Sequence, residues 1–183
     1  MTRPNSSHTG KRRRNRARGT EAAPQLAPDQ REACETAIGY RFKDPLLLDR
    51  AMTHRSATQG KAVAWSNERL EFLGDRVLGL VIVDTLLVRF PDLREGDLAP
   101  RLNALVSRDT CAVVGAELGL GQYLIVDRSE RATGGATKRS LLANAAEAVI
   151  GAVYLDGGLK AAEKFILRHW AALLKASNDK PRD

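Results

Sequence analysis

At 183 residues, the chain is long enough for one domain with a sizeable core, either alone or with a tail. Its 43% hydrophobic content is typical of a globular protein, and its low aromatic content, with long periodic runs of Leu, Val and Ala, favours an all-α fold. The most apolar run, residues 77–88, contains Asp84 and is too short to cross a membrane, which excludes a membrane-spanning helix there.

The net charge of +7 is concentrated at one end of the chain. Residues 1–20 hold seven basic side chains and no acidic one, whereas the remaining residues carry 22 of each sign. Segment 1–28 is therefore predicted to be a disordered basic tail, because it has too few apolar residues to bury. Two interpretations stay open, namely added RNA affinity through phosphate contacts and a solubilising or expression-related extension. The tail lacks the apolar stretch of a secretion signal, although an acid-free, Arg-rich start is compatible with an organellar transit peptide.

Six helices are predicted from apolar periodicity and from residues that start or stop a helix. The first follows Asp29, a capping acid, and the second follows Asp44 and Pro45, an acid with proline at the first helical position. The third ends at Pro91. The expected helices cover residues 30–38, 46–52, 67–90, 98–118, 141–155 and 161–174, with non-periodic loops at 57–66 and 123–137.

The third helix begins with the stretch Asn-Glu-Arg-Leu-Glu-Phe-Leu-Gly-Asp at 67–75. On a helix, Glu68, Glu71 and Asp75 share one face. The positions around and after them are almost all apolar, which indicates a helix buried on most sides. Burying acids costs several kcal/mol unless a positive group compensates them, and a divalent metal ion is the simplest compensator for clustered oxygen ligands.

The fifth helix carries a second polar pair, Asn144 and Glu147, on one face. If the two helices face each other, Glu71, Asp75, Asn144 and Glu147 converge on one point. All four offer oxygen donors, and none of the three histidines has a matching spacing, which excludes the di-iron pattern of helix bundles and disfavours zinc. Hard oxygen ligands favour Mg²⁺ or Mn²⁺.

The stretch 67–75 resembles the signature of the ribonuclease III family in both residue identity and spacing. The resemblance covers about residues 30–175, so that the family's nuclease domain is expected over 29–176 and the start of a linker over 177–183. It extends to Thr53-His54-Arg55-Ser56, Phe90-Pro91, Glu95-Gly96-Asp97, Gly134-Gly135 and residues 141–158.

The resemblance implies an all-α homodimeric nuclease domain that hydrolyses both strands of double-stranded RNA, with a role in RNA processing, rRNA included. It implies Mg²⁺, with Mn²⁺ as a substitute, and products with 5′-phosphates, 3′-hydroxyls and two-nucleotide 3′ overhangs. Glu68 and Glu95 match acids that support the site or the dimer interface. The positions that match the catalytic metal ligands are Glu71, Asp75, Asn144 and Glu147.

Two features depart from the family pattern. Bacterial members continue into a double-stranded-RNA-binding domain, whereas this sequence ends about where a linker would begin, so a truncated or short form with weak RNA affinity is expected. The position of Asn144 is normally aspartate, and an amide brings no negative charge. We expect weaker metal binding and slow or absent cleavage with an intact fold, whether Asn144 is natural or was introduced to trap substrate.

Other candidates have a plain structural alternative. The basic residues near the 123–137 loop either contact RNA phosphates or form a solvated face, and His54 is expected to pack near the site rather than perform chemistry. Cys34 and Cys111 are expected in the core, in a reducing compartment such as the cytoplasm.

Alternatives to the nuclease are a non-cleaving duplex-RNA-binding or ribosome-associated scaffold and a di-metal hydrolase of small phosphate esters. The basic residues that are candidates for contacting RNA phosphates are Arg128, Arg131, Lys138 and Arg139.

Overall fold

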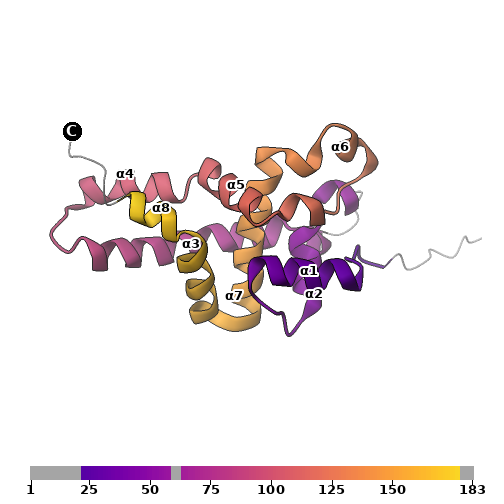
Figure 1. Cartoon of the computed structure of the whole chain (residues 1–183), viewed down its shortest axis with the longest axis horizontal. Helices are drawn as coiled ribbons and strands as arrows, with labels where there is room; N and C mark the ends of the chain where they lie inside the picture. Colours follow the sequence, from indigo (N-terminus) through magenta and orange to yellow (C-terminus); the bar gives the residue numbers. More distant parts are fainter. Residues whose placement is uncertain (1–21, 59–62, 178–183) are drawn as a thin grey trace, which may run out of the picture.

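The computed structural model describes residues 22–58 and 63–177, which fold into helices joined by short turns (Figure 1). The all-α prediction is confirmed: within these residues the one β-type pairing is an isolated bridge between Thr53 and Ile125. The helices are α1 (Pro28–Ile38), α2 (Pro45–Met52), α3 (Glu68–Arg89), α4 (Glu95–Leu105), α5 (Arg108–Glu117), α6 (Arg128–Ala132), α7 (Arg139–His169) and α8 (Ala171–Ala176).

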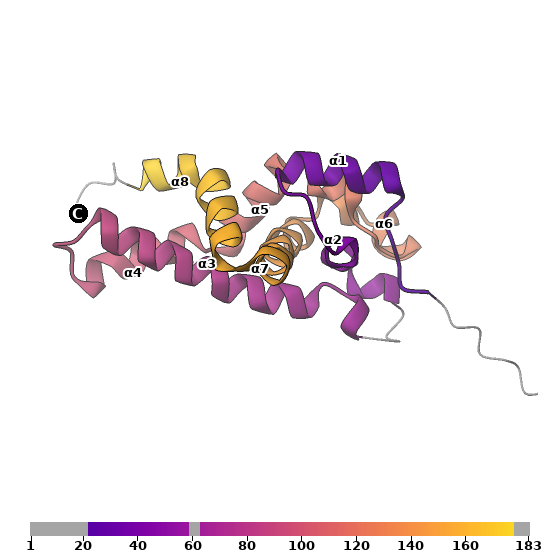
Figure 2. The same cartoon turned by 90° about the horizontal axis from the view of Figure 1, so that it is seen from below.

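Helix α7 is the centre of the fold. Figure 2 shows its first part nearly end-on, between α3 and α5, and α3 runs along the long axis of the molecule. The inner face of α7 is made of small and branched side chains that are fully buried, among them Ala145, Ala148 and Ile150. Short side chains on this face let both neighbouring helices approach closely, so α7 receives contacts from α2, α3 and α5.

The crossing of α3 and α7 depends on two glycines. A Cβ atom on Gly74 would lie 1.8 Å from the carbonyl oxygen of Glu147, and one on Gly151 would lie 2.2 Å from that of Leu70. Since any side chain at either position would collide with backbone, the two helices meet backbone to backbone.

The prediction of a single helix over 98–118 is wrong. The chain forms two helices there, α4 and α5, which are separated at Val106 and Ser107. The Ser107 hydroxyl caps α5 by accepting from the Thr110 N–H at 3.2 Å. The indole of the buried Trp170 donates to the Leu105 carbonyl at 2.9 Å, which satisfies an acceptor at the end of α4. The break turns the start of α5 toward α7.

Two other expectations about helices need correction. The loop expected over 123–137 contains α6, which Asp127 caps by accepting from the Glu130 N–H at 2.7 Å. The break expected between residues 155 and 161 is confirmed, because Gly158 has non-helical φ and ψ angles of 77° and −177°, so that α7 consists of two helical stretches on either side of this residue. The second stretch ends at His169 rather than at residue 174, and α8 begins at Ala171.

The N-terminal boundary also differs from the expectation. Helix α1 begins at Pro28, so Asp29 lies in its first turn and is not its cap. Leu26 is only 5% exposed, and its N–H donates at 3.1 Å to the buried Asp49, which also pairs with Arg31 at 2.8 Å. The packed part of the chain therefore includes residues assigned to the 1–28 tail, whereas residues 1–21 and 178–183 lie outside the described structure. Within the described ranges, no helix is long and apolar enough to span a bilayer.

Candidate active site

One large cavity, of about 830 Å³, opens where α3, α5 and α7 meet. The acidic residues of α3 predicted from the sequence line one side of it, and the polar pair of α7 lines the adjoining side. We call it the carboxylate cavity. Its lining includes Glu68, Glu71, Asp75, Asn144 and Glu147.

The close helix crossing explains why these side chains share a cavity. Gly74 lies between Glu71 and Asp75 on α3, and its contact with the Glu147 carbonyl places the α7 acid directly opposite them. Asn144 is three residues earlier on α7, on the same face and nearer its N-terminus. The spacing within each helix was visible in the sequence, and the glycine contact determines which parts of the two helices meet.

Two acidic side chains of the cavity, Glu71 and Glu147, have raised pKa values, because both are partly buried and lie near the negative charges of other acids. Burial, followed by the neighbouring charges of Glu71 and Asp75, raises the pKa of Glu147 to about 7. Burial is also the main reason why the pKa of Glu71 is raised. The thiol of the buried Cys111 hydrogen-bonds Glu147 and favours its charged form. Carboxylates held in this way are poised to bind a cation or a proton.

Arg108, in the first turn of α5, is a cavity residue that the sequence analysis missed. Its Nη2 donates to Oδ1 of Asn144 at 2.6 Å, and its charge lowers the pKa values of Glu71 and Glu147. Its place depends on the α4–α5 break at Ser107, since in the expected unbroken helix there was no reason to put it at this cavity. The Ser-x-x-Thr capping pattern at Ser107 and Thr110 was the available signal.

The carboxylate and amide oxygens of the cavity are the ligand types that a hard divalent cation prefers, although they do not lie within coordination distance of one point. In residues 22–58 and 63–177, no three His, Cys, Asp or Glu side chains are close enough together to hold a metal ion. One further oxygen has no partner, because Asn67 is a buried residue of the cavity lining whose Oδ1 accepts no hydrogen bond in the described structure. The donor set therefore fits Mg²⁺ or Mn²⁺ chemically, and binding requires the side chains to converge.

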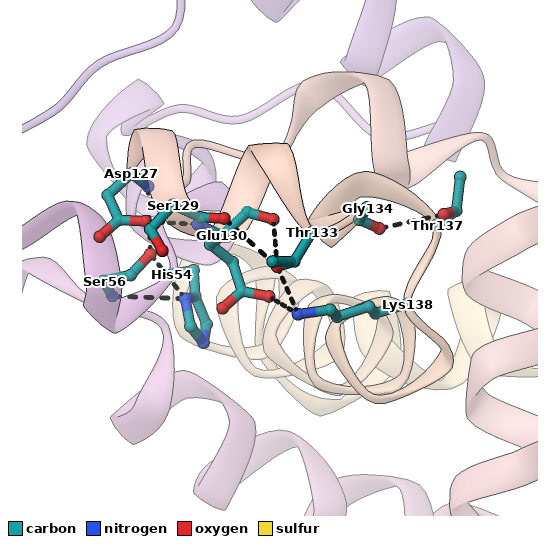
Figure 3. A network of polar contacts seen from close by, with 9 residues as sticks. All are labelled: His54, Ser56, Asp127, Ser129, Glu130, Thr133, Gly134, Thr137 and Lys138. Carbon is teal, nitrogen blue, oxygen red and sulfur yellow. Dashed lines mark hydrogen bonds and ion pairs between the residues drawn. The ribbon is translucent and has the colours of Figure 1, made fainter.

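Of the four basic residues proposed from the sequence to bind RNA, one lines the carboxylate cavity and three do not. Lys138 lines the cavity, where its Nζ pairs with Glu130 and donates to the Thr133 hydroxyl at 2.9 Å (Figure 3). Arg139 pairs at 3.0 Å with the exposed Asp109, outside the cavity lining. Arg128 and Arg131 are exposed on α6 and do not line it either.

Glu95 is separated from the other acids within one chain. It borders an apolar groove of about 390 Å³ between the second half of α3 and α4. Conversely, His54, which was expected to pack near the site, lines the carboxylate cavity itself, as does its neighbour Arg55.

Comparisons with known proteins agree with the fold. The Ribonuclease-III-like family model matches residues 44–173. Ribonuclease 3 of Dinoroseobacter shibae is 53% identical over 147 residues, covering 80% of this chain and 63% of that protein. Ribonuclease 3 of Caulobacter vibrioides is 49% identical over 150 residues, covering 81% and 65% respectively. The chain thus spans less than two thirds of either relative.

A solved structure shows the same similarity. The nuclease domain of ribonuclease III from Campylobacter jejuni, described for flexibility in a region involved in dimer formation, superposes with a TM-score of 0.71 at 40% identity. The alignment covers 75% of this chain and 94% of that domain. The chain therefore belongs to the ribonuclease III family and contains the family's nuclease domain.

Proposed function

We propose that the chain is a metal-dependent endoribonuclease that hydrolyses double-stranded RNA at the carboxylate cavity. The observation that carries this proposal is the meeting of Glu71, Asp75 and Glu147, two of them with raised pKa values, in one cavity beside Asn144. Relatives named Ribonuclease 3 support it. The products are 5′-phosphate and 3′-hydroxyl ends with two-nucleotide 3′ overhangs.

In this proposal Glu71, Asp75, Asn144 and Glu147 hold Mg²⁺, or Mn²⁺ in its place. Bound metal ions supply activation of a water molecule and stabilisation of the leaving oxygen. Glu147 must lose its proton to act as a ligand, and Arg108 must release Asn144 before the amide oxygen can turn to a metal. Asn144 contributes a neutral donor where aspartate would bring a charge, so the proposed activity is low.

The remaining candidates have supporting roles in the proposal. Glu68 accepts from the Ser66 hydroxyl at 3.1 Å and borders the ligands, which suits an acid that orients them. Lys138 lies at the cavity edge, where it can contact a backbone phosphate, and Arg128, Arg131 and Arg139 offer weaker contacts from the exposed surface. The buried, free thiols of Cys34 and Cys111 suit the reducing cytoplasm.

We further propose a homodimer formed through the exposed side of α3. Five large apolar side chains of this helix are exposed, Val88 by 77% and Phe72 by 69%, together with Leu80, Val83 and Leu87. The apolar groove bordered by Glu95 adjoins the same helix, which extends the apolar surface and places Glu95 at the interface. A second copy covers such a face with two-fold symmetry, matching the pseudo-symmetry of the two strands of duplex RNA.

A second candidate is a non-cleaving member that binds duplex RNA or a ribosomal particle as a scaffold. It is favoured by Asn144 and by its hydrogen bond to Arg108, which places a cation where a metal ion would be needed. The retained acids oppose it, because a scaffold gains nothing from carboxylates whose burial raises their pKa values.

The proposed function is tested with an end-labelled RNA duplex of about 30 base pairs, which is longer than the roughly 16 base pairs that a duplex-RNA-binding module spans. Controls are the two separate strands and the DNA duplex of the same sequence. We expect slow cleavage of the RNA duplex alone, dependent on Mg²⁺ or Mn²⁺, stopped by EDTA, and lost in Glu147→Gln. Equal cleavage of single strands, or cleavage that survives EDTA, contradicts the proposal.

A further inference from the structure

A chain of hydrogen bonds fixes one histidine at the edge of the carboxylate cavity. The Asp127 N–H donates to the Ser56 hydroxyl oxygen at 3.1 Å, and that hydroxyl lies 2.9 Å from Nδ1 of His54. The backbone N–H of Ser56 also points at Nδ1, at 3.3 Å. Figure 3 shows this chain leading from α6 to the imidazole ring.

These contacts determine which ring nitrogen carries the proton. The Ser56 N–H can only donate, and the Ser56 oxygen already accepts from Asp127, so its own hydroxyl proton is available for Nδ1. Nδ1 of His54 therefore faces two donors and must be the unprotonated acceptor. The proton of the neutral ring is on Nε2, and an imidazolium would set one N–H against another.

The protonated nitrogen faces the cavity. His54 is half-buried and lines the cavity together with Glu130 and Lys138, and in Figure 3 its second nitrogen points away from Ser56. Nε2 has no hydrogen-bond partner among residues 22–58 and 63–177. A donor that is held in place at the cavity edge with no partner in the described chain is available to an acceptor that enters the cavity.

The charges around the ring do not overcome the effect of burial. Glu130, Asp127 and Glu68 raise the pKa of His54 and Arg55 lowers it, yet burial, the largest cause, leaves the pKa below its usual value. The ring is therefore neutral near pH 7. A ring protonated at Nε2 cannot ligate a metal ion through that nitrogen, so His54 is a hydrogen-bond donor and not a missing ligand.

We propose that His54 donates its Nε2 proton to an oxygen acceptor of the RNA backbone, either a ribose 2′-hydroxyl or a phosphate oxygen. Ser56 is the positioning residue, since it fixes the tautomer and the direction of the ring. The inference rests on the proposed function, because it assumes that duplex RNA enters the carboxylate cavity. Backbone oxygens recur at every nucleotide and do not depend on sequence, which suits recognition of duplex RNA by shape.

Three variants separate a donor from a purely structural residue. His54→Gln carries an amide N–H₂ at about the distance of Nε2, whereas His54→Asn keeps only a shorter side chain near Nδ1, and Ser56→Ala removes the donor that orients the ring. Affinity for duplex RNA is measured by fluorescence anisotropy without divalent metal, so that cleavage plays no part. Circular dichroism and thermal unfolding confirm that each variant is folded.

We expect His54→Asn to weaken RNA binding by about three- to tenfold, as the loss of one hydrogen bond does, and His54→Gln to restore it to within about twofold. In ¹⁵N spectra of the free protein we expect a protonated Nε2, and in Ser56→Ala a raised His54 pKa. If 2′-deoxy substitution in the duplex abolishes the penalty of His54→Asn, the acceptor is the 2′-hydroxyl. If the penalty persists, the acceptor is a phosphate oxygen.

Three results overturn the inference. A spectrum with the proton on Nδ1 contradicts the hydrogen-bond assignment, independently of any RNA. Equal RNA affinity of the parent and His54→Asn removes the contact while leaving the proposed function in place. Failure of the parent to bind duplex RNA at all removes the proposed function, and this contact with it.

Discussion

The Nη2 atom of Arg108 lies 2.6 Å from Oδ1 of Asn144, so an arginine of α5 holds the amide at the one neutral position among the four proposed ligands. The same guanidinium lowers the pKa values of Glu71 and Glu147. In this structure Arg108 therefore supplies a positive charge beside the proposed ligands, and a divalent ion has to compete with it.

Replacing Arg108 tests this competition. We expect Arg108→Ala to tighten Mn²⁺ binding about threefold or more, because a nearby positive charge is removed and the Asn144 oxygen is released. The measurement is Mn²⁺ titration followed by electron paramagnetic resonance, without RNA. Arg139→Ala is the matched control, since Arg139 pairs with Asp109 outside the cavity lining. Unchanged or weaker Mn²⁺ binding in Arg108→Ala would show that Arg108 does not compete.

Glu147 should make the metal-free protein less stable as the pH rises. Its pKa is about 7 in the folded protein and 4.5 in the unfolded chain, so between these values the folded state binds more protons than the unfolded state. The free energy of unfolding therefore falls from pH 4.5 to about 7, by up to about 3 kcal/mol from this group. Urea unfolding of the parent and Glu147→Gln at several pH values, in EDTA, measures the difference. Parallel pH profiles for the two proteins are incompatible with this assignment.

Metal binding should have the opposite dependence on pH. A divalent ion competes with the proton on Glu147, so Mn²⁺ affinity should increase as the pH rises and level off above about 7, where the carboxyl is deprotonated. Mn²⁺ titrations from pH 5.5 to about 8.5 measure this effect. An affinity that does not vary with pH would mean that Glu147 is not a ligand.

The α3–α7 crossing should tolerate no side chain at Gly74. The added Cβ in Gly74→Ala meets the Glu147 carbonyl at 1.8 Å, and separating the helices should cost about 3 kcal/mol or more. Gly79→Ala, on the same helix with open space at its Cβ, should instead stabilise by about 0.5–1 kcal/mol. Urea unfolding compares the two variants. Similar stabilities for both would contradict the close backbone contact.

The exposed apolar side of α3 should control assembly. Val88→Glu and Phe72→Glu should convert the proposed dimer into folded monomers, because each buries a charge at the interface. Val113→Glu on α5 is the control, since this exposed valine lies on another helix. Sedimentation velocity measures the oligomeric state. A parent that sediments as a monomer, or variants that remain dimers, would exclude this interface.

Much of the fold could be predicted because it depends on local patterns. The spacing of Glu71 and Asp75 on one helix, and of Asn144 and Glu147 on another, requires only helical geometry, and the structure places all four in one cavity. Gly74 follows the same local logic, since a glycine between acids on a buried helix permits the close approach of another backbone that the structure shows.

The parts that could not be predicted depend on contacts between distant residues. The break between α4 and α5 is stabilised by the bond from Trp170 to Leu105, 65 positions apart in the chain. Because Arg108 follows that break, its contact with Asn144 was equally hidden. The donor role of His54 depends on Asp127 through Ser56, a relationship between a loop and the cap of a five-residue helix that no periodicity reveals.

The most direct test of the account is cleavage of one RNA duplex by the parent and by Asn144→Asp, side by side in Mg²⁺ and in Mn²⁺. Restoring the fourth carboxylate adds a charged ligand and an ion-pair partner for Arg108, and it should raise the cleavage rate about tenfold or more, with two-nucleotide 3′ overhangs. If both versions are folded, bind the duplex and leave it uncut in either metal, the nuclease account is contradicted and the scaffold function replaces it.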